Sequence, residues 1–66
     1  MFEVKKDISP VVKKGDKLIL SGDNYVLEGQ EAAWVDGKDQ DGKNIKSPNF
    51  YHKDLVEDLP NFFKKL

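Results

Sequence analysis

The side chains best suited to binding chemistry in this chain are Trp34 and Tyr51, together with Pro48 three positions before the tyrosine. An outward-facing tryptophan on a sheet is a frequent anchor for a protein partner. Aromatic rings beside a proline can form a shallow groove for an extended peptide. We therefore expect partner binding at Trp34, Pro48 and Tyr51. The alternatives stay open: Phe62 and Phe63 cover Trp34 as part of the core, and Pro48 and Tyr51 serve only as a turn proline and a half-buried tyrosine.

A catalytic site would need a nucleophile and a base brought together. His52 has Tyr51 and Asp54 as neighbours, and the available hydroxyl nucleophiles are Ser9, Ser21 and Ser47. None of the serines lies in a sharp turn that would present it to a histidine. The five glycines fall one to a turn, without a phosphate-binding cluster. We therefore expect no enzyme and no cofactor, with His52 at the surface.

The acidic residues of one loop have a spacing that is close to that of a calcium-binding loop. Asp36, Asp39, Asp41 and Gly42 belong to this pattern, but Gly37 stands where a ligand carboxylate is needed and a proline replaces the bidentate glutamate. The chain has no cysteine and one histidine, so a zinc site is also unsupported. The sequence predicts a solvated hairpin tip here and no metal.

Composition limits the classes of protein that fit. The 66 residues allow one domain, residues 1–66, with a small core. Eleven basic and twelve acidic residues are interspersed and give a net charge of −1, and no segment is apolar enough for a signal peptide or a membrane span. We expect a cytoplasmic protein. Nucleic-acid binding is disfavoured, because every basic residue is a lysine and arginine is the usual reader of phosphates and guanine.

Alternating apolar residues and turn signals predict a chain of short strands. Gly15 is expected to take a positive φ in the turn before the second strand. Residues 36–43, which contain Asp-Gly twice, are expected to form a tight hairpin. The predicted strands are 2–7, 17–21, 24–28, 31–36 and 43–46.

The core and the tail complete the expected fold. The predicted core residues are Leu18, Leu20, Val35, Ile45 and Leu55. Residues 50–59 show a mixed pattern that fits either a helical turn or a last short strand. Pro60 suits the first position of a helix, so residues 60–65 are expected to be helical or a turn. The fold class is therefore all-β, a small barrel or sandwich.

The order of these elements resembles the Src-homology-3 (SH3) barrel. Segment 11–20, VVKKGDKLIL, is similar to the diverging turn and second strand of that family, Trp34 stands near its middle-strand tryptophan, and residues 48–51, PNFY, have its Pro-x-x-Tyr spacing. The resemblance implies a five-stranded antiparallel SH3-like barrel with residues 55–59 as the final strand and a short C-terminal helical turn. Segment 60–63, PNFF, is similar to the end of small bacterial and phage barrels. The loop acids with which the family binds arginine-bearing proline-rich ligands are missing here.

These observations favour a small non-enzymatic interaction module, bacterial or prophage-encoded, that binds a protein or peptide. Two alternatives remain. One is a barrel that binds nucleic acid through a lysine patch formed by Lys5, Lys6, Lys13, Lys14 and Lys17. The other is a structural subunit that associates with itself through an edge strand.

Overall fold

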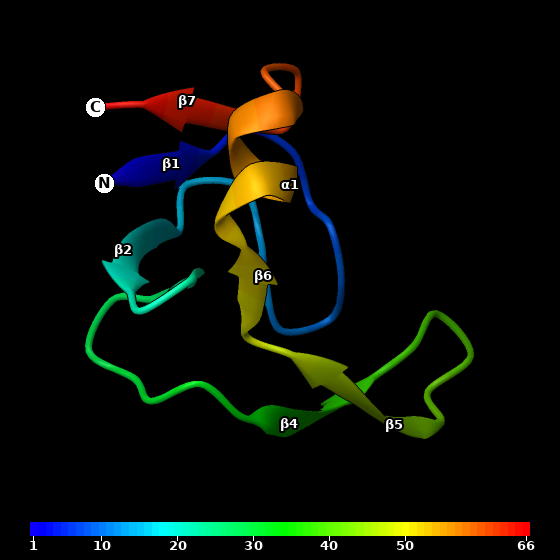
Figure 1. The fold of residues 1–66 in the computed structure, drawn as a ribbon. Coiled ribbons are helices and arrows are strands. Elements are labelled where there is room, and N and C mark those ends of the chain that lie inside the picture. Colours follow the sequence, from blue (N-terminus) through cyan, green and yellow to red (C-terminus); the bar gives the residue numbers. More distant parts are fainter.

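The computed structural model describes residues 1–66 as a mostly β domain with one short helix (Figure 1). Seven strands are formed where five were predicted. The elements in chain order are β1 (Phe2–Val4), β2 (Lys17–Ser21), β3 (Asn24–Leu27), β4 (Trp34–Lys38), β5 (Asn44–Pro48), β6 (Phe50–His52), α1 (Lys53–Asp58) and β7 (Phe63–Lys65). The helix is neither long nor apolar enough to cross a membrane.

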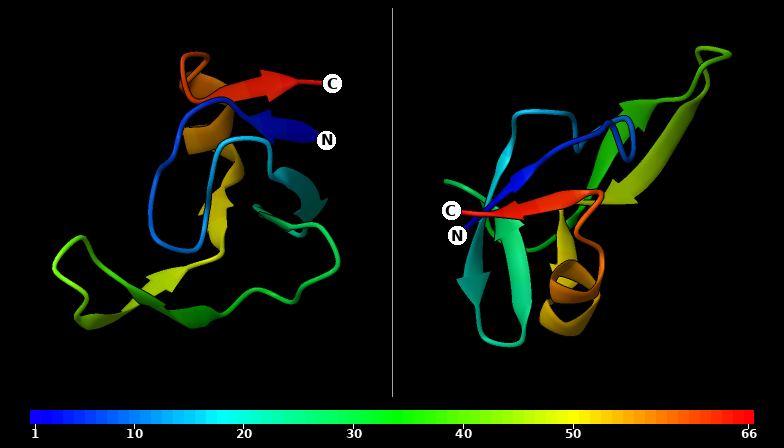
Figure 2. Two further views of the ribbon diagram at one scale, coloured as in Figure 1. Left: turned by 180° about the vertical axis from the view of Figure 1, so that it is seen from behind. Right: turned by 90° about the horizontal axis from the view of Figure 1, so that it is seen from above.

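The strands form two antiparallel sheets. The larger sheet curls and has the order β6-β3-β2-β1-β7, while β4 and β5 form a separate two-stranded hairpin. Figure 2 shows that this hairpin reaches away from the rest of the domain and that the two chain ends lie side by side. Backbone pairing explains the proximity of the ends, because Phe2 lies opposite Lys65 and the amide of Leu66 donates to the carbonyl of Met1.

Turn chemistry places the predicted hairpins. Gly15 takes a φ of 95° before β2, as expected. Gly22 has a φ of 61° at the first central position of the β2–β3 turn, which is the requirement of a type II′ hairpin. In the β4–β5 hairpin, the Oδ1 atom of Asp39 accepts hydrogen bonds from the amides of Asp41 and Lys43. The side chain of Asp39 therefore stabilises the backbone of the hairpin tip.

The tail differs from the expectation. Residues 53–58 form a helix, residues 60–62 a turn and residues 63–65 a strand. The predicted helix or turn at 60–65 is therefore right, as a turn, only for residues 60–62, and the implied final strand at 55–59 is wrong. His52 caps the helix, since its Nδ1 atom accepts the amide of Asp54 at 3.1 Å. Pro60 follows the last helical turn rather than opening one, because the residue before a proline resists the helical conformation.

The core lies between the inner face of the larger sheet, α1 and the loop before β2. Only one of the five predicted core residues, Leu18, belongs to it. Its buried members are Phe2, Val4, Val12, Leu18, Tyr25, Leu27, Val56 and Phe63.

Of the predicted core residues, Leu18 is fully buried, and Val35 and Ile45 are half-buried. The burial of Leu20 and Leu55 was predicted wrongly: both are about half exposed. Leu20 lies on the same inner face as Leu18, but β1 does not extend that far along β2. At Leu20, β2 therefore has a paired neighbour only in β3. Leu55 borders an open apolar hollow beside the core, and the buried residue of α1 is Val56.

Candidate functional site

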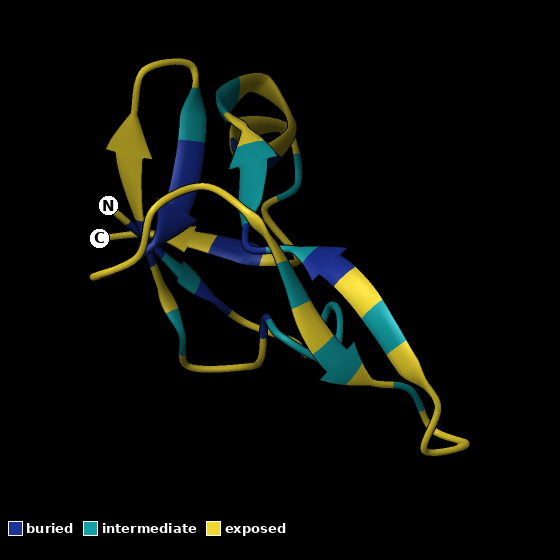
Figure 3. Ribbon diagram, turned by 90° about the horizontal axis from the view of Figure 1, so that it is seen from below, coloured by how far each residue is buried: buried dark blue, intermediate teal, exposed yellow.

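The β4–β5 hairpin presents Trp34 to solvent. Trp34 pairs with Pro48 across the two strands, and residues paired in this way project to the same face. Along both strands, exposed residues alternate with more buried ones (Figure 3). Val35 and Ser47 turn toward the domain, and the Trp34 side chain points outward with 61% of its surface exposed. Two of the three residues expected to bind a partner, Trp34 and Pro48, therefore lie side by side.

Phe50 is the third member of this surface, and the sequence analysis missed it. The rings of Trp34 and Phe50 lie edge to face with centroids 6.4 Å apart. Phe50 opposes Val26 in the neighbouring strand, so it belongs to the outer face of the larger sheet. We call Trp34, Pro48 and Phe50 the aromatic platform. Their clustering depends on Asn49, the buried residue between the last two.

Asn49 fixes the loop that leads into β4. Its Oδ1 atom accepts the amide of Ala33, and its Nδ2 atom donates to the side chain of Gln30 and the carbonyl of Glu31. All three distances are 2.9 Å, and only 1% of the residue is exposed. A buried amide with all of these partners is a strong positional constraint. Asn49 therefore sets the position of Trp34.

Tyr51 lies on the opposite face from the platform. Its ring packs against that of Phe63, with the ring centroids 5.8 Å apart. Tyr51 also borders an apolar hollow of about 140 Å³, whose other lining residues are Ile8, Leu55, Leu59, Phe62 and Phe63. Burial raises the pKa of the Tyr51 hydroxyl, and a hydrogen bond with Ser9 acts in the opposite direction. The structure thus does not bring Tyr51 together with Trp34 and Pro48.

Phe62 and Phe63 do not cover Trp34, so that alternative is wrong. Phe63 is a core residue paired with Val4, and Phe62 borders the hollow beside Tyr51. The ammonium group of Lys6 lies 5.6 Å from the centroid of the Phe62 ring, within the range of a cation–π contact. Both rings therefore contact other side chains, on the opposite face of the sheet from the platform.

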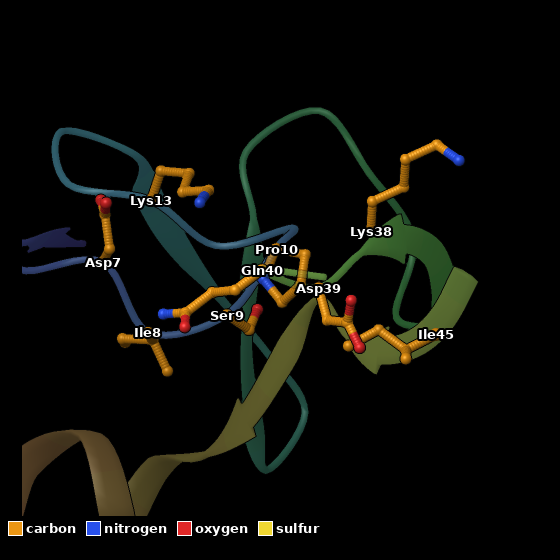
Figure 4. A pocket seen from close by; sticks show the side chains of 9 residues that line it. All are labelled: Asp7, Ile8, Ser9, Pro10, Lys13, Lys38, Asp39, Gln40 and Ile45. Carbon is orange, nitrogen blue, oxygen red and sulfur yellow. The ribbon is translucent and has the colours of Figure 1, made fainter. Parts of the chain in front are cut away.

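A larger hollow, of about 430 Å³, separates the loop before β2 from the hairpin tip (Figure 4). It is lined by Asp7, Ile8, Ser9, Pro10, Lys13, Lys38, Asp39, Gln40 and Ile45. Several of its polar atoms already hold the surrounding loops. Asp7 accepts the amide of Lys14, Ser9 accepts those of Val11 and Val12, and Asp39 accepts two in its own turn. The hollow is therefore an open junction between two loops.

The residues considered for catalysis do not converge. His52 is used as the helix cap, and Ser9 hydrogen-bonds its own loop and Tyr51. Ser21 lies in one register row with Asn24 and His52, two strands from the histidine. That separation is about 10 Å, which is too long for proton transfer. Ser47 is buried on the inner side of the hairpin.

The lysines proposed as a patch take part in separate local contacts. The Nζ atom of Lys5 donates to the carbonyl of Pro60, and Lys6 lies over Phe62. Lys17 stands between two glutamates of the neighbouring strands, Glu3 and Glu28. No three histidine or carboxylate side chains gather as a group that could hold a metal ion.

Comparisons of the chain with models of protein families, with curated proteins and with solved structures found no match in any of the three.

Proposed function

We propose that this protein is a small non-enzymatic binding module that takes a protein or peptide partner on the aromatic platform of Trp34, Pro48 and Phe50. The observation that carries the proposal is the 61% exposure of Trp34 next to Pro48, on a hairpin that turns it away from the core. A 66-residue chain has few large rings with which to build a core. Leaving its one tryptophan outside sacrifices roughly 1.5–3 kcal/mol of burial. A binding role accounts for that arrangement.

The platform has the chemistry of an interface centre. Tryptophan is among the residues that contribute most to binding when they are covered by a partner. The ring of Phe50 packs edge to face with the indole ring, and Asn49 fixes the backbone next to both residues. Little conformational freedom is therefore lost when a partner covers the indole ring, which favours affinity.

The surroundings of the platform suggest a partner with both apolar and polar groups. Beyond Trp34, the same hairpin face carries Asp36, whose carboxylate lies 3.2 Å from the ammonium group of Lys46. The next pair contains Lys38, which donates to Asn44. This order of side chains fits a partner that places an apolar group on the indole ring and hydrogen-bonding groups along the rest of the hairpin.

We further propose that the fold is a variant of the SH3-like barrel. The curled antiparallel sheet, the β4–β5 hairpin and the turn at Gly15 support it. In this variant the loop before β2 keeps no acidic cluster, and the helix α1 stands between the last two strands. We therefore expect arginine-bearing proline-rich peptides to bind weakly or not at all.

Titration of isotope-labelled protein with a panel of proline-rich and unrelated peptides tests the function. We expect the bound peptides to shift the signals of Trp34, Phe50 and the hairpin. The Trp34→Ala variant should bind at least about tenfold more weakly, the usual loss at a central tryptophan. Tyr51→Phe, on the opposite face, is the matched control and should bind normally. Shifts confined to residues 13–17 or 62–66, or equal binding by Trp34→Ala, would refute the platform as the site.

A further inference from the structure

The outer face of the larger sheet carries its side chains in register rows, because directly paired residues of antiparallel strands project to the same side. Phe2 and Leu18 are paired and face the core, so the residues next to them in β1 and β2 face outward. One such row runs across the sheet and is entirely apolar; Met1 and Leu66 lie just outside β1 and β7, and Val26 is already buried within the single chain. From β7 to β6 it consists of Leu66, Met1, Ile19, Val26 and Phe50.

The next row on this face carries charges that alternate in sign. Glu3 opposes Lys64 on one side and Lys17 on the other, and the amide of Glu28 donates to the carbonyl of Lys17. In strand order the row is Lys64, Glu3, Lys17 and Glu28. None of these four belongs to an ion pair: the two lysine–carboxylate pairs of the molecule join Lys46 to Asp36 and Lys53 to Asp23.

The outer face is unusually apolar for the amount of core that the domain has. Only eleven of the 66 residues are buried, while Met1, Ile19 and Leu66 in the apolar row are 41–54% exposed. Domains of this size commonly gain stability by association when they have no disulfide or metal. A standard interface covers about 800 Å² on each partner, about a sixth of the 4596 Å² surface of this molecule.

We propose that two copies of this chain associate through their outer faces, about a two-fold axis that passes between Glu3 and Lys17. The order of charges is what selects a second copy as the partner. Read from the opposite end, the row has the opposite sign at every position. A two-fold axis at its centre therefore places Glu3 against Lys17 of the second copy, and Lys17 against Glu3 of that copy. The outer members of the row, Lys64 and Glu28, complement each other in the same way.

The apolar row adds contact area to this charge pairing. The same axis places Met1 of one copy against Ile19 of the other. Because the sheet curls (Figure 2), the closest approach of two outer faces runs along the axis, between β1 and the central strand β2. Phe50 belongs both to the row and to the aromatic platform, but it lies in β6, two strands from β2. The contact along β1 and β2 is therefore separate from Trp34 and does not depend on the function of the platform.

The competing explanation is that the alternating charges act only within one sheet, where opposite charges on neighbouring strands are stabilising. The two explanations differ for a mixture of variants. Reversal of one charge, as in Glu3→Lys or Lys17→Glu, is unfavourable within a chain and also between identical chains. When Glu3→Lys chains meet Lys17→Glu chains, the contacts between chains become complementary again, whereas those within each chain stay unfavourable.

Sedimentation velocity over a wide concentration range tests the interface. We expect the mass of the wild-type protein to rise from 7.5 kDa toward twice that value, and the association to weaken with added salt because the charge pairs between the two copies are screened. Glu3→Lys and Lys17→Glu should each remain monomeric where the wild type is dimeric. An equimolar mixture of the two should form dimers again. Lys43→Glu, at the distant hairpin tip, is the control and should dimerise normally.

Several outcomes would overturn the proposal. A wild-type protein that stays monomeric up to its solubility limit would do so, as would folded single variants that dimerise like the wild type. Circular dichroism shows whether each variant is folded. If either reversal prevents folding, the neutral variants Glu3→Gln and Lys17→Gln replace them. Each should weaken dimerisation several-fold, and unchanged dimerisation would refute the interface.

Discussion

Gly37 packs closely against Pro10. A Cβ atom added to Gly37 would lie only 2.9 Å from the Cβ atom of Pro10. The same atom would stand 3.1 Å from Cγ1 of Val11. This is where the inner side of the β4–β5 hairpin meets the loop before β2. The absence of a side chain at position 37 therefore lets the hairpin that carries Trp34 dock on the domain.

Replacing Gly37 with alanine tests this contact. We expect Gly37→Ala to lower the free energy of unfolding by roughly 1–3 kcal/mol through overpacking, which outweighs a gain of below about 1 kcal/mol from restricting the unfolded chain. Urea unfolding followed by Trp34 fluorescence measures the change. Pro10→Gly removes the opposing Cβ atom. In that background, Gly37→Ala should therefore lower the free energy of unfolding by less than it does in the wild type. Additive effects of the two substitutions would contradict the contact.

Two leucines of one strand provide a second prediction. Leu18→Ala should lower the free energy of unfolding by about 2–5 kcal/mol, because it leaves a cavity in the core. The same substitution at Leu20 should cost less than about 1 kcal/mol, since that side chain is about half exposed. Chemical denaturation of both variants measures the difference. Equal losses would show that the hairpin end around Leu20 is covered.

The buried amide of Asn49 provides a third prediction. Asn49→Asp replaces the donor Nδ2 with an acceptor, so the side-chain oxygen of Gln30 and the carbonyl of Glu31 lose their partner. We expect a loss of roughly 1–3 kcal/mol in unfolding free energy, the cost of leaving buried polar groups unpaired. Thermal and urea unfolding measure it. The control is Asn44→Ala on the exposed hairpin face, which should change stability by less than about 0.5 kcal/mol; a similar loss there would argue against a special role for Asn49.

Tyr51 provides a prediction about pH. Its pKa is raised from 10.0 by burial, with the Ser9 hydrogen bond opposing the shift. In the unfolded chain the hydroxyl loses its proton at the lower pH, so the folded form holds more protons as the pH rises past 10. The contribution of the neutral hydroxyl to stability is therefore present below the unfolded pKa and is lost as the pH rises through the folded pKa. Urea midpoints measured from neutral to alkaline pH should fall more steeply for the wild type than for Tyr51→Phe, and parallel curves would contradict this.

The elements that depend on neighbouring residues were predictable from the sequence. Strand β2 was predicted with its observed bounds, because its alternation lies between turns with glycines at 15 and 22. Strand β7 was not predictable in this way, since Phe63–Lys65 has neither alternation nor a following turn. It forms because β1 offers a free edge, and that edge is supplied by residues at the other end of the chain.

The candidate site was predictable in part for a related reason. Outward placement of Trp34 followed from alternation with Val35. The choice between Phe50 and Tyr51 depends on register, because a shift of one residue moves every side chain of a strand to the other face. For residues 50–59 the sequence left a helical turn and a short strand open, so the face occupied by Phe50 was not predicted. The exposure of Leu20 also could not be predicted, because it depends on where β1 ends rather than on β2 itself.

The pairing of β1 with β7 has a consequence for the order of folding. It joins residues separated by almost the whole chain, whereas β2–β3 and β4–β5 are local hairpins. Closing a long loop costs more entropy than closing a short one, and folding slows as contacts between distant residues come to dominate. The two hairpins can therefore nucleate independently, and the sheet is completed only when the chain ends meet. Until then the outer edge of β1 stays open, which makes the last step of folding the one most exposed to wrong strand pairing.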